Sequence, residues 1–460
     1  MRDRVSSLMA APNPHSAKSS NAVHGSVDVT IEKLVYGGEG LAHHDGATIF
    51  VPFVVPSERV TIEAVEQKKK FVRARLNRVV QPSPERAAPL CRHFGVCGGC
   101  DYQHIPYEAQ VKYKAEILRE TLRRLGKTDW PGEIITHASE AWRYRNRAQW
   151  KVRPLAKSGN AGDPSCGEPR LGIGYFRANS TSLCPVDDCP ILTPVLLKTL
   201  LAIRDGLAAG ALPRELREIE AFAADDMGRD GARVLLTATF AGFPSRAAEH
   251  AAKIRDFIPE VESLLFYDPG HDRMELFGPG FVQCRVGEYT YRVGHFSFFQ
   301  VNRFLAEALA REVAETEAAG DVALDLFAGV GLFAVPLAAK FKRVIAVESN
   351  PAAARDLETN AKGHAIEIRT SDVEPFVDKF RSTPDLVVLD PPRAGLSPEA
   401  ARRLSQIAPR RIAYVSCEPP TLARDLAVFR AGGYEISEIH LFDLFPQTFH
   451  METLVRLSRS

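Results

Sequence analysis

Three cysteines stand close together in the pattern Cys91-x5-Cys97-Gly-Gly-Cys100. Three thiolates within ten residues suit an iron–sulfur cluster or a structural zinc ion, and the glycines let the backbone fold around the bound group with its amides directed at sulfur. Cys189 and Cys184 are the candidates for a fourth ligand. The spacing disfavours three unrelated free thiols. It also differs from the Cys-x3-Cys-x2-Cys of radical enzymes, which favours a structural or substrate-recognition role.

A turn with two glycines, Asp325-Leu-Phe-Ala-Gly-Val-Gly331, follows an apolar run and precedes a predicted helix. Gly329 and Gly331 permit a tight turn and a close approach of the backbone to a ligand. The turn lacks the third glycine of the dinucleotide fingerprint. It therefore predicts a site for a small adenosyl ligand in preference to NAD.

Three carboxylates follow the next apolar runs. Glu348 ends the second run, where a carboxylate can accept both hydroxyls of a ribose, Asp372 lies past the next expected strand, and Asp390-Pro-Pro-Arg393 ends a fourth. Ligands of α/β sheets bind at this carboxyl edge. The alternative, ordinary loops with solvated acids, is disfavoured because the set is ordered over four strand ends.

A separate cysteine, Cys417, ends the fifth apolar run at the same predicted edge. A thiolate there is a candidate nucleophile, although its position alone fits a buried, half-hydrophobic cysteine equally well. Glu452 follows the stretch from Phe442 to Phe449 and is expected to face the same pocket. Taken alone, such a residue would more often be a surface acid.

The stretch from Trp142 to Arg153 carries five basic residues and no acid, with Trp142, Tyr144 and Trp150 interleaved. Basic groups neutralise phosphates while aromatic rings stack on unpaired bases, so the stretch is a candidate RNA-binding surface. The alternative is a strand with a basic solvent face and its aromatics in the core. The pattern favours neither interpretation.

The elements that position these residues belong to an ordinary globular chain of 460 residues, 45% hydrophobic and 25% charged, with a net charge of +1. This composition excludes a wholly disordered chain, a collagen and a coiled coil, and the length indicates about three domains. The longest uncharged stretch of the nucleotide region, Leu326 to Ala339, is too short to span a bilayer. The first 25 residues lack an apolar signal core and are expected to be a disordered tail, which predicts a reducing cytoplasm.

Short alternating strands between Val27 and Val80 predict a small β-barrel of the OB type. Its Lys68-Lys-Lys70 hairpin is either a solvated tip or a phosphate contact. A helix is expected from Tyr107 to Leu125, and an exposed loop containing Cys166 from Pro154 to Pro169. From Asp321 onward, apolar runs alternate with helical stretches, which predicts a parallel, doubly wound α/β sheet.

With these motifs in place, the chain resembles the bacterial RNA (uracil-5-)-methyltransferases that carry an N-terminal TRAM domain and a [4Fe–4S] cluster. The resemblance covers most of the chain from about Val27 and is closest to the 23S rRNA 5-methyluridine enzymes. Its most specific motifs are Val51-Pro-Phe-Val-Val-Pro, Cys91-x5-Cys97-Gly-Gly-Cys100, Phe298-Phe-Gln-Val-Asn302, Asp325 to Gly331, Asp390-Pro-Pro-Arg and Ser416-Cys-Glu-Pro-Pro-Thr-Leu-Ala-Arg-Asp425.

The resemblance implies a TRAM OB-like barrel (26–82), a central α+β iron–sulfur and RNA-binding domain (83–285) and a Rossmann-like methyltransferase domain (286–460) after the tail (1–25). It implies Cys417 as nucleophile and Glu452 as general base. The implied cluster ligands are Cys91, Cys97, Cys100 and Cys189, and the implied S-adenosylmethionine contacts are Gln300, Phe327, Gly329, Glu348, Asp372 and Asp390. The chain departs from the family at three positions: relatives often have Asn in place of Glu418 and Cys in place of Ala328, and sometimes Asn in place of Leu332. These departures concern the detail of the cofactor contacts.

The implied activity is methylation of carbon 5 of a specific uridine in RNA, through a covalent bond between Cys417 and carbon 6. The expected partner is 23S rRNA, with tRNA as the alternative, and neither a membrane nor a protein partner is implied. An amino-group methyltransferase is disfavoured because Arg393 replaces the aromatic residue such enzymes place after Asp-Pro-Pro. A non-catalytic assembly factor would not need the full set of cofactor positions.

Overall fold

The structure is a computed structural model that describes residues 25–155, 170–224 and 231–459. The expected tail, apart from its last residue, and the loop that contains Cys166 lie outside the described residues. Contacts divide the chain into two compact units. The first comprises the residues up to Lys33 and Glu39–Ser83, and the second comprises Leu34–Gly38 and Pro84–Ser460.

The first unit is built on a six-stranded sheet with the order β1-β5-β6-β4-β3-β2. Its strands are β1 (Ser26–Thr30), β2 (Lys33–Leu34), β3 (Glu39–His44), β4 (Ala47–Pro52), β5 (Arg59–Gln67) and β6 (Phe71–Gln81). Alternate residues of β4 are buried, as the period of a strand requires, and they join a small apolar core. Ion pairs join Lys68 to Glu66 and Arg75 to Glu63 within this unit.

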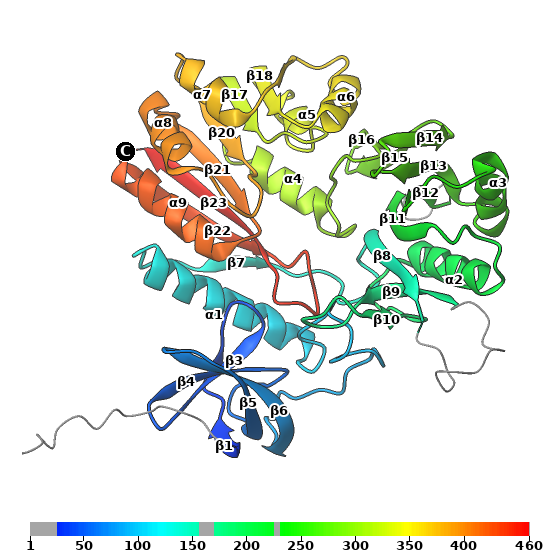
Figure 1. Cartoon of the computed structure of the whole chain (residues 1–460). Coiled ribbons are helices and arrows are strands. Elements are labelled where there is room, and N and C mark those ends of the chain that lie inside the picture. Colours follow the sequence, from blue (N-terminus) through cyan, green and yellow to red (C-terminus); the bar gives the residue numbers. More distant parts are fainter. Residues whose placement is uncertain (1–24, 156–169, 225–230, 460) are drawn as a thin grey trace, which may run out of the picture. The chain divides into compact units, whose positions relative to one another are not determined.

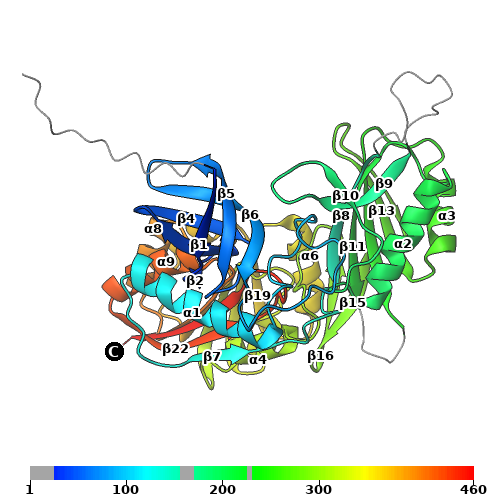
Figure 2. The same cartoon turned by 90° about the horizontal axis from the view of Figure 1, so that it is seen from below.

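The central part of the second unit contains a seven-stranded sheet with the order β10-β9-β8-β11-β12-β13-β14. The elements up to residue 294 are α1 (Tyr107–Leu125), β7 (Ile134–His137), β8 (Arg147–Pro154), β9 (Leu171–Phe176), β10 (Leu183–Pro185), α2 (Pro194–Ala208), β11 (Leu216–Ala224), β12 (Arg233–Phe240), α3 (Ala247–Phe257), β13 (Val261–Asp268), β14 (Arg273–Phe277), β15 (Phe281–Val286) and β16 (Tyr289–Gly294). Helices α2 and α3 pack side by side against one face of this sheet (Figure 2). The expected helix from Tyr107 to Leu125 is confirmed as α1.

The aromatic residues of the basic stretch lie in the core of this sheet. Tyr144 and Trp150 are fully buried, and Trp142 packs against the same core. Lys151 pairs with Glu218 and Arg147 with Glu220 on the neighbouring strand β11. The base-stacking interpretation is therefore wrong for Tyr144 and Trp150. The strand period directs these side chains inward, and the long-range pairing with β11 supplies the acids that the local sequence lacks.

The C-terminal part of the second unit is an eight-stranded sheet with the order β19-β18-β17-β20-β21-β23-β22-β7. Its remaining elements are α4 (Ala306–Ala314), β17 (Gly320–Leu326), α5 (Ala334–Leu337), β18 (Phe341–Glu348), α6 (Pro351–Asn360), β19 (Ile366–Thr370), α7 (Val373–Lys379), β20 (Leu386–Leu389), α8 (Pro398–Ile407), β21 (Arg411–Ser416), α9 (Pro419–Ala431), β22 (Tyr434–Phe442) and β23 (Glu452–Arg459). The strands from β19 to β21 are parallel, and α8 and α9 cover the face opposite to α4 and α5 (Figure 1). The predicted doubly wound α/β sheet is confirmed.

One strand of this sheet comes from far earlier in the chain. β7 pairs in parallel with β22, with His137 opposite Phe442, and α1 packs on α9. Residues 107–137 therefore contribute both a helix and an edge strand to the C-terminal sheet. The local sequence did not predict this pairing, because an edge strand of four residues has no periodic signal of its own. No helix among the described residues is long and apolar enough to cross a membrane.

Candidate active site

The turn after β17 adopts a conformation that leaves room for a ligand. Phe327, Gly329 and Gly331 all have positive φ values, of 69°, 56° and 95°. A Cβ atom on Gly331 would lie 2.7 Å from the Leu357 side chain, and the positive φ of this residue would strain any residue with a side chain. A Cβ atom on Gly329 would meet nothing within 4 Å. The backbone at Gly329 thus faces open space at the carboxyl edge of the sheet.

Glu348, at the end of β18, lies against this turn. Its Oε2 accepts a hydrogen bond from the backbone N–H of Gly329 at 2.7 Å, and its Oε1 accepts one from the N–H of Asn350 at 2.6 Å. Each carboxylate oxygen keeps a further lone pair for a ligand hydroxyl. Asp372 is exposed at the residue that precedes α7. Its neighbour Ser371 donates a backbone hydrogen bond to the Glu348 carbonyl at 3.1 Å.

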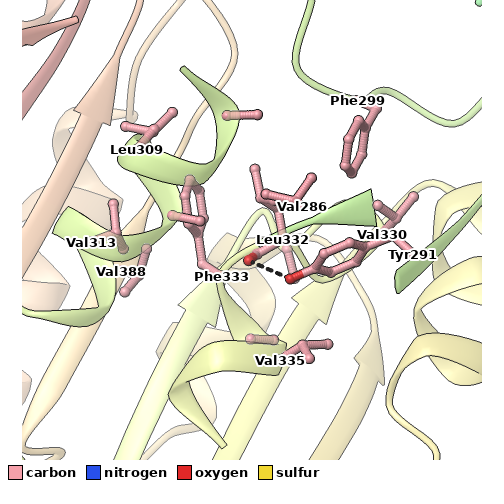
Figure 3. Close-up of a cluster of buried hydrophobic side chains, with 14 of the residues drawn as sticks. Val286, Tyr291, Phe299, Leu309, Val313, Val330, Leu332, Phe333, Val335 and Val388 are labelled. Atoms are coloured by element: carbon pink, nitrogen blue, oxygen red, sulfur yellow. Dashed lines mark hydrogen bonds between the residues drawn. The ribbon is translucent and has the colours of Figure 1, made fainter. Parts of the chain in front are cut away.

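A cluster of buried apolar side chains fixes this turn to the segment that carries Gln300. Figure 3 shows Val286 and Tyr291 of the β15–β16 hairpin packed with Phe299 and with the turn residues Val330 and Leu332. The Tyr291 hydroxyl donates a hydrogen bond to the Leu332 carbonyl at 3.2 Å. The Phe299 side chain is buried in this cluster, and Gln300, which follows it, is only 4% exposed.

The segment before Gln300 has a second anchor on α6. The Asp356 carboxylate accepts hydrogen bonds from the Arg292 Nε at 2.7 Å, the Gly294 N–H at 2.6 Å and the Ser297 hydroxyl at 2.7 Å. Asp356 is 3% exposed, so these charge-assisted bonds form in a dry environment. The two anchors fix the segment that carries Gln300, for which the sequence analysis expects a cofactor contact.

Cys417 and Glu452 meet because two neighbouring strands place them opposite each other. β21 pairs with β23 in antiparallel register with Ser416 opposite Thr453, so Cys417 follows the last paired residue of β21 and Glu452 precedes its partner. Glu452 is 5% exposed, and its Oε1 has no hydrogen-bond partner. A buried carboxylate oxygen without a partner is costly in a structural role and is typical of a group held ready for a reaction.

Burial and neighbouring acids raise the pKa values of this pair. Burial raises the pKa of Cys417 to about 12, with further contributions from the charges of Glu452 and Asp390 and an opposing one from Arg393. Burial, followed by Asp390, also raises the pKa of Glu452 well above its usual value, and Arg393 again opposes the shift. Burial raises the pKa of Asp390 to about 7. Perturbed groups gathered at a strand edge are typical of active sites.

Arg393 is the residue whose importance the sequence analysis missed. Its charge lowers the pKa values of both Cys417 and Glu452. The sequence feature that could have indicated this role is the position of Arg393 directly after Asp390-Pro-Pro, at the ligand-binding edge of the sheet.

The four expected cluster cysteines line one cavity in the second unit. Cys91, Cys97, Cys100 and Cys189 line a space of about 330 Å³, which Arg393, Phe445, Thr448 and His450 of the C-terminal part also line, whereas Cys184 does not line it. The backbone N–H of Cys91 donates to the Gln103 side chain at 2.9 Å, which orders the cysteine segment. Within the described ranges, no three His, Cys, Asp or Glu side chains are grouped so that they could hold a metal ion.

The fold and the site define an α/β enzyme of the methyltransferase type. The structure is similar to that of the tRNA (uracil-54, C5)-methyltransferase of Pyrococcus abyssi in complex with S-adenosyl-L-homocysteine, with a TM-score of 0.72 and 24% identity, over 93% of this chain and 99% of that one. Two family models match, the TRAM domain over residues 25–76 and tRNA (Uracil-5-)-methyltransferase over residues 281–460.

Full-length relatives extend this result. The 23S rRNA (uracil(1939)-C(5))-methyltransferase RlmD of Halomonas elongata is 33% identical over 99% of this chain and 94% of its own length. The protein of the same name from Klebsiella pneumoniae (strain 342) is 32% identical over 97% of this chain and 98% of its own length. An uncharacterized RNA methyltransferase of Aquifex aeolicus is 32% identical over 93% of this chain and 97% of its own length. The chain belongs to the RNA (uracil-5-)-methyltransferase family, which confirms the resemblance seen in its motifs.

Proposed function

We propose that this protein methylates carbon 5 of a specific uridine in 23S rRNA, with S-adenosylmethionine as the methyl donor. The observation that carries the proposal is the placement of Cys417 opposite Glu452 at the strand edge that also bears the Gly329 turn and Glu348. A thiol paired with a buried carboxyl has no evident task in other kinds of methyl transfer. The 23S rRNA substrate is supported by the names of relatives that match this chain along nearly its whole length.

The residues around the turn fit the adenosyl ligand. We assign the contacts to Gln300, Phe327, Gly329, Glu348, Asp372 and Asp390. The open space at Gly329 admits a close approach to the backbone, and the Glu348 carboxylate is placed to accept hydroxyls of a ribose. When bound, S-adenosylmethionine supplies an electrophilic methyl group on a positively charged sulfur.

The side chains then account for the order of bond changes in uracil. The Cys417 thiolate forms a bond to carbon 6, and the electrons of the 5,6 double bond move onto carbon 5 and the adjacent carbonyl. Carbon 5 becomes nucleophilic and takes the methyl group. The Glu452 carboxylate removes the carbon-5 proton, the double bond re-forms, and the bond from carbon 6 to sulfur breaks. The uridine must leave its stack first, which costs a few kcal/mol.

This assignment predicts a pH dependence with a definite sign. Since the pKa of Cys417 is raised to about 12 and that of Glu452 is also raised, the reactive thiolate and carboxylate forms both become more populated as the pH rises. We expect kcat/KM for RNA to increase by at least about tenfold per pH unit from about pH 6 to pH 8, because the Cys417 thiol titrates above this range and Glu452 can only make the rise steeper. Arg393→Gln should move this rise to higher pH, because it removes a cation that lowers both pKa values. A flat profile in the wild type would contradict the assignment.

The test of the function itself is methyl transfer to unmodified 23S rRNA and, in parallel, to unmodified tRNA by anaerobically purified protein, with the modified position mapped by mass spectrometry. Methylation of a 23S rRNA uridine at carbon 5 is expected. Methylation of tRNA alone would keep the chemistry and overturn the substrate. No methylation of either RNA, by protein that binds S-adenosylmethionine in calorimetry, would overturn the function.

We further propose that residues 83–285, apart from the α1–β7 segment that joins the C-terminal sheet, form an iron–sulfur and RNA-binding domain, in which Cys91, Cys97, Cys100 and Cys189 hold a [4Fe–4S] cluster. Four thiolates could also hold a single zinc ion in tetrahedral geometry. A cavity of about 330 Å³ lined by four thiols suits a polynuclear cluster better. Thiolate ligation of this kind agrees with a reducing cytoplasm as the site of action.

Metal analysis tests this proposal. Protein purified without oxygen should be brown and contain about four iron and four sulfide per chain. Cys100→Ser should lose most of the iron, because it removes a thiolate that lines the cavity. Cys184→Ser is the matched control and should keep it, since Cys184 lies outside the lining. Zinc in place of iron in the wild type would contradict the cluster.

A further inference from the structure

The segment between β22 and β23 runs from Asp443 to Met451 and ends directly before Glu452. Gln447, near its centre, has a φ of 70°, in the left-handed region that a residue with a side chain seldom adopts. It is also 2% exposed. A strained, buried, polar residue in an active-site loop persists only when its surroundings hold it in place.

Gln447 is held by residues that lie more than 300 positions earlier in the chain, among them Gln110, which is 337 positions away. Its backbone N–H donates to the Gln110 Oε1 at 2.9 Å, and the Gln110 Nε2 donates to the Gln447 Oε1 at 3.0 Å. Its carbonyl accepts hydrogen bonds from the backbone N–H groups of Asp101 at 2.9 Å and Tyr102 at 3.0 Å. Gln110 is fully buried on α1, and Asp101 directly follows Cys100.

An ion pair and further hydrogen bonds also hold the segment between β22 and β23. The Lys114 ammonium pairs with the Asp443 carboxylate at 2.6 Å, with neither side chain exposed, and donates to the Phe445 carbonyl at 3.1 Å. The Tyr144 hydroxyl donates to the Pro446 carbonyl at 2.9 Å. The loop that leads to Glu452 is therefore bonded to the cysteine-bearing segment and to α1.

Cys417 lies on a different segment from this loop. It lies between the end of β21 and the start of α9, in the middle of the C-terminal sheet. A change in the loop would move the start of β23, and with it Glu452, more than it would move Cys417. The two chemical groups are thus supported by different parts of the structure.

We propose that Gln447 is a positioning residue that, through its paired amides with Gln110, holds Glu452 for proton removal from carbon 5 and couples this step to the cysteine-bearing segment. The proposal rests on the proposed function of Cys417 and Glu452. It assigns Gln447 to the removal of the carbon-5 proton, the late step of the reaction, because Cys417, which makes the first bond, lies outside the loop.

The test compares Gln447→Ala, Gln110→Ala and Gln447→Gly in single-turnover and steady-state assays. Gly tolerates the left-handed backbone and keeps the backbone N–H bond to Gln110 but lacks the side-chain amide, so it separates backbone strain from the side-chain hydrogen bond, whereas Gln110→Ala removes both bonds. All three variants should lower kcat by about tenfold or more, leave KM for S-adenosylmethionine within about twofold and accumulate a methylated protein–RNA adduct stable in SDS. Gln283→Ala, at an exposed position of β15, is the control and should behave as wild type.

A merely structural role for Gln447 would reduce the fraction of active protein without accumulating the adduct, and that result would overturn the proposal. An unchanged kcat would do so as well. The proposed function is judged separately by the wild type and by Glu452→Gln. If the wild type methylates RNA and Glu452→Gln traps the adduct, a failure of the Gln447 and Gln110 variants to trap it counts against the positioning role alone.

Discussion

Replacing Cys417 by alanine is expected to reduce methyl transfer to RNA by at least about 10⁴-fold, the scale of loss when a covalent nucleophile is removed. The physical reason is that carbon 5 of uracil is too weak a nucleophile until a thiolate has added to carbon 6. The thiolate is well suited because sulfur is both a good nucleophile and a good leaving group. The measurement is the single-turnover rate with saturating S-adenosylmethionine.

The matched control for this variant is Cys284→Ala. Cys284 is a buried cysteine of β15, away from the strand edge that carries Cys417, and its replacement should leave the rate within about threefold of the wild type. Calorimetry should show that Cys417→Ala still binds S-adenosylmethionine, because the turn at Gly329 is intact. A normal methylation rate in Cys417→Ala would refute the covalent mechanism.

Replacing Glu452 by glutamine should trap the enzyme on its RNA. The amide has the shape of the carboxyl group but cannot take the carbon-5 proton, so the methylated adduct forms and cannot decompose. We expect kcat to fall by about 10²- to 10⁴-fold, the usual contribution of a general base. The adduct should appear as an RNA-dependent band of lower mobility in SDS gels, with the methyl label in the band.

Two further variants make this result specific. Cys417→Ala combined with Glu452→Gln should give no band, because the bond to carbon 6 cannot form. Glu435→Gln changes an exposed acid on the neighbouring strand β22 and should turn over normally without a band. If Glu452→Gln shows no trapped species while its rate falls, Glu452 is not the base.

The sequence by itself determined the features that depend on short stretches of chain. The apolar runs predicted the parallel strands, because buried strands of a doubly wound sheet are apolar on both faces. Once the strands are in place, Gly329, Glu348 and Asp390 must meet at one edge, since each follows the carboxyl end of a parallel strand. The motifs from Cys91 to Cys100 and from Ser416 to Asp425 carried the family resemblance because each is also a short, continuous stretch of chain.

Only the tertiary structure decided the features that depend on partners far along the chain. The sequence left open whether Trp150 stacks on a base or lies in a core, and the pairing of β8 with β11 placed it in a core. The four residues of β7 gained their place from β22, some 300 residues later. The pairing of Gln110 with Gln447 had no local signal at all. Local patterns report how a segment is buried, whereas such contacts arise from the closure of long loops, which no local pattern records.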